Sequence, residues 1–377
     1  MGRTKRLLRL NATLLVGMCA ALPAQEAEYD SGTFLRHCAS RHEKLLTSQA
    51  QFRCRRVLEE LEKDPEADNR GVAQALNNLA VISCAQGQYA DAQAFSRRAM
   101  AILEKVHDRD ELAFASALNN LAASYYREGM YLEAERAYRR ALAIRERLLG
   151  PDHPLAAESL NNLAALYARF ADQRAEPLYK RALLINEKAS GLGSLPAADT
   201  LNNLAVLHLH QRKPSLAEPL LRKALEAYEK HLGPDHPSVA TALYNLGLAC
   251  GKLGRHEEAI RHSQRALSIR RLVLGNQHPL VALTLNLLGE LRCSRGVYNE
   301  AEVLYKEALA IQERALGPDH PETAGTMLNY SRLLRQTKRK PQAKALEAQA
   351  KMILSEKAGE NPANFTINVT DFTGGNK

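Results

Sequence analysis

Pairs of adjacent asparagines recur along the sequence, and their type and spacing suit the recognition of another molecule. An asparagine side chain carries an oxygen acceptor and an amide donor. A row of such groups can bond to the backbone of an extended peptide without demanding one peptide sequence. The alternative is that the pairs hold neighbouring helices together, and we expect this role mainly for the second member. The first members are Asn77, Asn119, Asn161, Asn202 and Asn286, and the second members are Asn78, Asn120, Asn162, Asn203, Asn245 and Asn329.

A second set of candidate binding residues is basic. Each of these residues follows an asparagine pair or its degenerate copy within about three helical turns, so the set is expected on one flank of the segments. Basic groups there could bind acidic side chains or a carboxylate of a partner, and otherwise they are solvated surface charges. The set comprises Arg127, Arg169, His210 and Lys252, with Arg332 and Arg335 in the last copy.

The sequence offers no constellation that is typical of an enzyme. It contains no glycine-rich phosphate loop, no nucleophile elbow and no paired carboxylates on one helical face. Four histidines precede prolines one or two repeat periods apart, on separate segments, which does not favour a shared metal ion. We therefore predict no catalytic residues, no cofactor and no metal site. These histidines are His153, His236, His278 and His320.

The six cysteines form no Cys-x-x-Cys motif, which excludes the usual redox and zinc-ribbon arrangements. In an exported protein, Cys38 and Cys54 could form a disulfide that joins an N-terminal pair of helices. Cys84, Cys250 and Cys293 are expected to be small buried residues.

Residues 1–24 have the plan of a cleaved secretory signal. A basic start is followed by a short apolar stretch and by Ala21-Leu22-Pro23-Ala24, so we expect cleavage after Ala24 and export to the periplasm or the medium. A lipid-modified Cys19, a myristoylated Gly2 and a simple amphipathic start are less favoured alternatives. No later apolar run reaches 18 residues, so no membrane span is expected in the mature chain.

The net charge of +9 is concentrated at the two ends of the sequence. Residues 1–24 carry four basic and no acidic residues, and 325–357 carry eight basic and two acidic ones. The body 25–324 is balanced, with 38 residues of each sign. A nucleic-acid-binding protein of this size should carry basic charge along its folded surface, so a nucleic-acid partner is not expected.

The elements that must position the asparagines form a repeat. The motif Leu-Asn-Asn-Leu-Ala begins at 76, 118, 160 and 201, and degenerate copies begin at 243, 285 and 327. A constant period of about 42 residues predicts a stacked array. In the second unit, Leu118, Leu121, Ala122 and Tyr125 lie on one helical face. Gly129 ends this helix, and a second helix with small residues such as Ala134 follows.

This pattern resembles the tetratricopeptide repeat, in the 42-residue form of kinesin light chains. The resemblance covers 72–357 and rests on Leu121-Ala122, Gly129, Ala134 and the linker Leu149-Gly150-Pro151-Asp152-His153-Pro154. It implies an all-α, right-handed superhelical solenoid of antiparallel helix pairs, whose first helices line a concave groove. The Lys and Asn arrangement that clamps a terminal carboxylate in chaperone-binding members is absent, because Ala123, Ala165 and Val206 replace its Asn.

Three units depart from the pattern at the turn between their helices. The third is one residue short near 171–173, the fourth has Arg212 and Pro214 for the turn Gly and Tyr, and the seventh has Lys338 for the Gly. The predicted organisation is a signal at 1–24, a helical cap at 25–71 that could be a degenerate further repeat, seven repeats at 72–357 and a polar tail at 358–377.

The predicted function is a non-catalytic scaffold that binds an extended peptide or a partner protein, acidic in character if the basic set takes part. The alternative is a structural or assembly component that uses its convex face or its ends.

Overall fold

The computed structural model describes residues 41–63, 69–105 and 110–360. Within these ranges the chain forms fifteen α-helices and no strand, which confirms the predicted all-α class. The predicted signal at 1–24, Cys38 and the tail beyond 360 lie outside the described residues, and the predictions made for them stay predictions. Among the described helices, none combines the length and apolar character needed to cross a membrane.

The chain divides into two compact units, and each is described by itself. The first unit contains α3 (Arg41–Glu62), α4 (Asn69–Ala85), α5 (Tyr89–Lys105), α6 (Glu111–Glu128), α7 (Tyr131–Leu149), α8 (Pro154–Arg169) and α9 (Ala175–Ser190). The second contains α10 (Leu195–His210), α11 (Pro214–Leu232), α12 (Pro237–Lys252), α13 (His256–Leu274), α14 (Pro279–Ser294), α15 (Tyr298–Ala315), α16 (Pro321–Gln336) and α17 (Lys340–Glu360).

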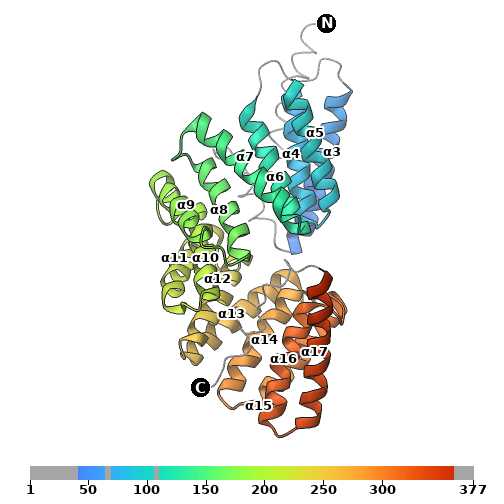
Figure 1. Cartoon of the computed structure of the whole chain (residues 1–377), viewed down its shortest axis with the longest axis vertical. Coiled ribbons are helices and arrows are strands. Elements are labelled where there is room, and N and C mark those ends of the chain that lie inside the picture. Colours follow the sequence, from blue (N-terminus) through green and yellow to red (C-terminus); the bar gives the residue numbers. More distant parts are fainter. Residues whose placement is uncertain (1–40, 64–68, 106–109, 361–377) are drawn as a thin grey trace. The chain divides into compact units, whose positions relative to one another are not determined.

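From α4 onward the helices form seven antiparallel pairs, one pair for each sequence repeat, as Figure 1 shows within each unit. Repeat 1 is α4 and α5, repeat 2 is α6 and α7, and the series continues to repeat 7, which is α16 and α17. Six of these pairs have extensive helix–helix contacts, and α8 and α9 share an apolar cluster of buried side chains. The second helix of one repeat also contacts the first helix of the next, for example α5 with α6 and α11 with α12.

Repeat 2 shows how the sequence produces one pair. The helix α6 ends at Gly129, whose left-handed backbone (φ 87°) lets its N–H donate to the carbonyls of Tyr125 and Tyr126. This termination is typical of a glycine that follows a helix. The side chains of Ala122 and Ala134 are fully buried, because small residues let the two helix backbones approach closely. The predicted helix boundaries of this repeat are therefore confirmed, as is the burial of Leu118, Leu121, Ala122 and Ala134, whereas Tyr125 is half-buried.

The turn between paired helices keeps one backbone conformation even where glycine is lost. Ala171, Arg212 and Lys338 have positive φ values of 51°, 59° and 63°, and they occupy the turn position that glycine holds in the other repeats. Non-glycine residues pay an energetic penalty in this region. Where glycine is replaced, the turn therefore keeps its backbone conformation, and the replacing residue is strained.

The histidine–proline linkers start the first helices. His236 stands at the N-cap of α12, and its Nδ1 accepts a hydrogen bond from the backbone N–H of Ser238 at 3.1 Å. The equivalent bonds are His153 with Leu155 N–H, His278 with Leu280 N–H and His320 with Glu322 N–H. The four histidines therefore cap helices, as side chains with an acceptor commonly do at this position.

One buried position near the end of the second helices holds a polar residue in five consecutive repeats, and its type varies, with arginine in two of them. The residues are Arg145, Asn186, Tyr228, Arg270 and Gln312. Arg145 donates to Ser159 Oγ at 2.8 Å and pairs with Glu158 at 3.2 Å, whereas Tyr228 donates to Asp199 at 2.7 Å. Arg270 makes the same bonds as Arg145: it donates to the Leu280 carbonyl and to Thr284 Oγ1, as Arg145 donates to the Leu155 carbonyl and to Ser159 Oγ. Burial lowers the pKa of Arg270 to about 10.

Candidate functional site

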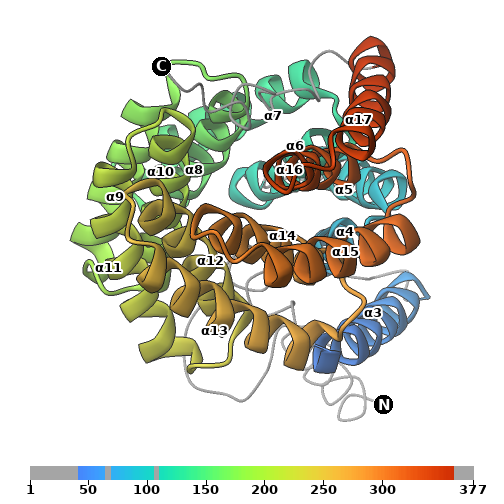
Figure 2. The ribbon, with the colours of Figure 1, turned by 90° about the horizontal axis from the view of Figure 1, so that it is seen from below.

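The first helices of consecutive repeats lie against one another and bring the asparagines together. Within the first unit α4 contacts α6, and within the second unit α10 contacts α12, α12 contacts α14, and α14 contacts α16. Figure 2 shows α11 and α13 on the outer side of α10 and α12 within the second unit. The inner row of first helices is therefore the surface on which the predicted binding residues must be sought.

The asparagines of successive repeats are joined by side-chain hydrogen bonds. In each case the second asparagine of one repeat donates from Nδ2 to Oδ1 of the first asparagine in the preceding repeat. The bonds are Asn162 to Asn119 at 3.3 Å, Asn245 to Asn202 at 3.0 Å and Asn329 to Asn286 at 3.2 Å. Both members of a pair thus contribute to the contact between repeats, a role that the sequence analysis expected mainly for the second member.

The first asparagines differ in whether the Nδ2 group of the side chain is already hydrogen-bonded within the protein. Asn119 donates from Nδ2 to Glu158 at 2.9 Å, so both ends of its side chain are bonded within the protein. For Asn202 and Asn286, no hydrogen bond from Nδ2 is formed within the described part of the chain, and both side chains are half-buried. These two amide groups therefore retain a donor that solvent or a partner can reach.

Asn77 and Asn161 complete the predicted row. Asn77 is buried, and its Oδ1 has no hydrogen-bond partner among the described residues. Asn161 is half-buried. The partner-binding role predicted for these positions and for Asn119 remains a prediction, but burial at Asn77 and Asn119 leaves little surface for direct contact.

The predicted basic residues occupy the last turns of the first helices. Arg127 and Lys252 are exposed, and Arg169 and Arg332 are half-buried. The Arg332 guanidinium donates from Nη1 to Asn329 Oδ1 at 3.2 Å, which ties it to the asparagine series. Lys252 forms no ion pair within the described ranges, so its ammonium group is available to a partner.

Glu290 on α14 adds a negative charge that the sequence pattern did not single out. It lies 42 residues before Arg332, at the equivalent position of the preceding repeat. Its side chain is solvent-accessible but lies among neighbouring helices; this crowding raises the pKa of Glu290, while Lys252 and Arg332 act in the opposite direction. The repeat period could have revealed Glu290, because it places this carboxylate on α14, between the helices that carry Lys252 (α12) and Arg332 (α16).

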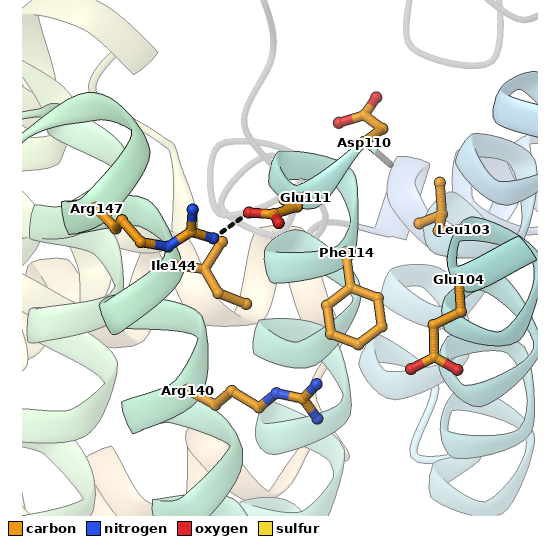
Figure 3. Close-up of a pocket in the computed structure, with 8 residues that line it drawn as sticks. All are labelled: Leu103, Glu104, Asp110, Glu111, Phe114, Arg140, Ile144 and Arg147. Atoms are coloured by element: carbon orange, nitrogen blue, oxygen red, sulfur yellow. Dashed lines mark hydrogen bonds and ion pairs between the residues drawn. The ribbon is translucent and has the colours of Figure 1, made fainter. Parts of the chain in front are cut away.

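A small recess lies between α5, α6 and α7, with a volume of about 240 Å³ (Figure 3). Phe114 forms part of its floor, and the Arg140 guanidinium carbon lies 5.0 Å from the centre of that ring. Arg147 and Glu111 form an ion pair across it. None of the lining residues belongs to the asparagine or basic sets, and we assign no ligand to this recess.

The predicted disulfide cannot be placed, because Cys38 lies outside the described residues. Cys54 is fully buried in α3. Cys250 is also fully buried, as predicted, whereas Cys84 and Cys293 are half-buried.

Comparison with known families identifies the repeat. Two family models described as tetratricopeptide repeat match the sequence, one at residues 72–110 and the other over much of the remaining chain. The second model matches five overlapping segments, 113–188, 172–230, 196–272, 238–296 and 280–353. No curated protein matches the sequence.

Several solved structures resemble this chain. The apo form of the quorum sensor NprR from B. thuringiensis has a TM-score of 0.62 and 14% identity, covering 93% of this chain and 94% of that one. A Rap protein complexed with Competence and Sporulation Factor has a TM-score of 0.58 and 15% identity, covering 93% and 99%. BtubC (BKLC) from P. vanneervenii is 24% identical, with a TM-score of 0.49, covering 60% and 89%. At these identities the first two likenesses show a shared fold.

Proposed function

The chain belongs to the tetratricopeptide repeat family, and we propose that it is a non-catalytic scaffold that binds an extended segment of a partner protein along its first helices. The observation that carries this proposal is the pair of available amide donors on Asn202 and Asn286. Their oxygens are occupied by the next repeat, so their orientation is fixed, while Nδ2 remains unbonded within the described residues. A fixed donor that needs no reorganisation suits the carbonyl groups of an extended peptide.

Charge on the same helices supports a partner with ionic groups. Lys252 and Arg332 flank Glu290 across three consecutive first helices, α12, α14 and α16. Two positive groups and one negative group would favour a segment in which acidic residues predominate. The Rap protein complexed with Competence and Sporulation Factor has the same fold, so the binding of another factor is compatible with this architecture.

The proposal is tested by replacing the donors and keeping the acceptors. In the double variant Asn202→Asp with Asn286→Asp, each side chain still offers an oxygen to Asn245 or Asn329 but can no longer donate. We expect this variant to keep its thermal stability and to lose partner capture in a pull-down from the native source. Undiminished capture by the double variant would argue against the first helices as the binding surface.

A second candidate function is assembly through the outer helices. Large apolar side chains are exposed there, namely Leu132 of α7 (67%), Leu272 of α13 (68%) and Val303 of α15 (64%). Isolated exposed apolar residues are common on soluble proteins, so they support assembly less strongly than the asparagine donors support binding along the first helices.

One crosslinking experiment distinguishes the two surfaces. A photo-crosslinking amino acid is placed at Lys252 on a first helix or, in a matched variant, at Leu272 on a second helix. Crosslinks to a partner from position 252 alone would support the inner surface. Crosslinks from position 272 alone would support assembly through the outer one.

A further inference from the structure

Three side chains that commonly bind transition metals meet inside repeat 5. Cys250 lies in the last turn of α12, and Glu258 and His262 lie one helical turn apart near the start of α13. Their potential ligand atoms, a sulfur, a carboxylate oxygen and an imidazole nitrogen, all lie within 4.8 Å of one another. The turn at Leu253–Arg255 between the two helices creates this arrangement, so spacing along one helix could not reveal it.

The three donors differ in chemistry but share a preference for one class of ion. Thiolate, imidazole and carboxylate are the ligands that zinc accepts in proteins, and sites with three protein ligands leave a fourth position for water or another ligand. Bound ligand atoms at zinc distances of about 2.0–2.3 Å lie closer together than 4.8 Å. The present spacing therefore requires a small inward movement of these side chains.

The His262 imidazole has an atom that needs a partner. Its Nε2 is shielded from solvent and makes no hydrogen bond within the described residues, although it lies 3.5 Å from Glu258 Oε1. A buried polar nitrogen left without a hydrogen bond costs free energy. The Cys250 thiol, on the facing helix, is completely buried, and its sulfur accepts a hydrogen bond from Arg255 Nη2 at 3.5 Å. A metal ion between the two helices would give the imidazole nitrogen a partner and would replace this long hydrogen bond at the sulfur.

The arginines beside Glu258 do not prevent this binding. Arg222 and Arg255 both pair with Glu258, but each of them also pairs with Glu218. If Glu258 turned toward a metal ion, neither guanidinium would lose its last carboxylate partner. The cluster therefore contains one carboxylate that can be released and one that can hold both arginines.

We propose that Cys250, Glu258 and His262 form a zinc-binding site that joins the two helices of repeat 5. The ligands come from both sides of the turn, so the bound ion would hold α12 and α13 together and stabilise this repeat. This site revises the expectation of no metal that the sequence pattern suggested, because that expectation considered ligands within single segments.

The test is metal binding by the full chain after removal of metals with a chelator. Zinc is added in a calorimetric titration, and cobalt(II) is added in a separate sample as a spectroscopic probe for a thiolate ligand. We expect saturable binding, a thiolate-to-cobalt charge-transfer band and a higher melting temperature with zinc. The variants Cys250→Ser and His262→Gln should each weaken binding by at least about tenfold, the smaller end of the losses seen even for groups outside the coordination shell.

The matched control is Cys293→Ser, which removes a half-buried thiol on the neighbouring α14 and should bind metal like the original chain. Circular dichroism of the metal-free variants establishes that they are folded. Absence of zinc binding by the folded original chain would overturn the proposal. So would binding that survives Cys250→Ser together with His262→Gln, or a cobalt band that disappears only in Cys293→Ser.

Discussion

Asn245 on α12 donates a hydrogen bond from Nδ2 to Oδ1 of Asn202 on α10, at 3.0 Å. This bond joins two repeats through side chains that are 43 residues apart, one more than the repeat period. It therefore pairs the second asparagine of one motif with the first of the preceding motif. The recurrence at Asn162 and Asn329 makes the amide pair a coupling element between repeats as well as a candidate binding feature.

The first prediction concerns the strength of this coupling. Asn245→Ala removes the donor and leaves the Asn202 oxygen without its partner, so we expect a loss of about 1–2 kcal/mol in the free energy of unfolding. The measurement is the midpoint shift in urea denaturation. Asn78→Ala is the control, because the Asn78 side chain only accepts from Gln74 in an exposed pair, and it should shift the midpoint little. Equal shifts for the two variants would contradict a coupling role.

A second prediction concerns the turn of repeat 7. Lys338 holds a left-handed backbone (φ 63°) that glycine adopts without strain. We expect Lys338→Gly to stabilise the protein by about 0.5–1 kcal/mol, since relief of backbone strain outweighs the greater freedom of glycine in the unfolded chain. Thermal denaturation measures the effect. The opposite replacement at the equivalent turn of repeat 5, Gly254→Ala at φ 77°, should destabilise the protein by about 1 kcal/mol.

The third prediction concerns a close approach in repeat 6. A Cβ on Gly289 would lie 2.8 Å from the Tyr305 ring, which is buried. We expect Gly289→Ala to destabilise by about 1–2 kcal/mol, because overpacking exceeds the helix propensity gained. Repeat 4 has Ala205 and Leu221 at the equivalent positions, and both lie in one apolar cluster. Combining Gly289→Ala with Tyr305→Leu should therefore recover stability, and a further loss in the double variant would contradict this packing argument.

The fourth prediction concerns pH. Hydrogen bonds from Arg339, Lys306 and Tyr330 lower the pKa of Glu302 from 4.5 to about 2. A carboxyl group with a lowered pKa in the folded state stabilises the protein above its unfolded pKa, and the contribution disappears as the pH falls. We expect about 1 kcal/mol at neutral pH, after allowance for solvent screening, to be lost between pH 4.5 and about 2. Thermal melts of Glu302→Gln over this range should show a correspondingly weaker pH dependence than the original chain.

The helix pairs could be predicted from the sequence because each follows from local chemistry repeated many times. The apolar spacing around Leu118 and the glycine at 129 fixed the boundaries of α6, and the buried alanines followed from their positions. The turns at Arg212 and Lys338 were recognised as departures. Their unchanged left-handed backbone was not predictable, since it depends on packing of the flanking helices.

The site was only partly predictable, because its geometry depends on distances between repeats. Period and residue type identified the asparagines, but they could not show that the Asn202 oxygen would be used by Asn245. Glu290 was accessible to the same register argument, because it lies 42 residues before Arg332, but it was missed because only basic residues were sought there. The cluster of Cys250 with His262 arises across a turn, and no single-helix spacing describes it.

The buried arginines near the ends of two second helices have a consequence for folding. A chain of seven similar repeats can dock a helix pair against the wrong neighbour, and misassembly of this kind is a characteristic failure of repeat proteins. Arg145 of α7 bonds to Ser159 on α8, and Arg270 of α13 makes the equivalent bond to Thr284 on α14, so each arginine needs a hydroxyl group on the first helix of the next repeat. Repeat 5 has Ala242 at the position of these hydroxyl groups. Docking α7 or α13 against such a first helix would leave a buried guanidinium short of a partner, at a cost of about 1–3 kcal/mol. The two arginines therefore restrict which first helices can pack beside α7 and α13.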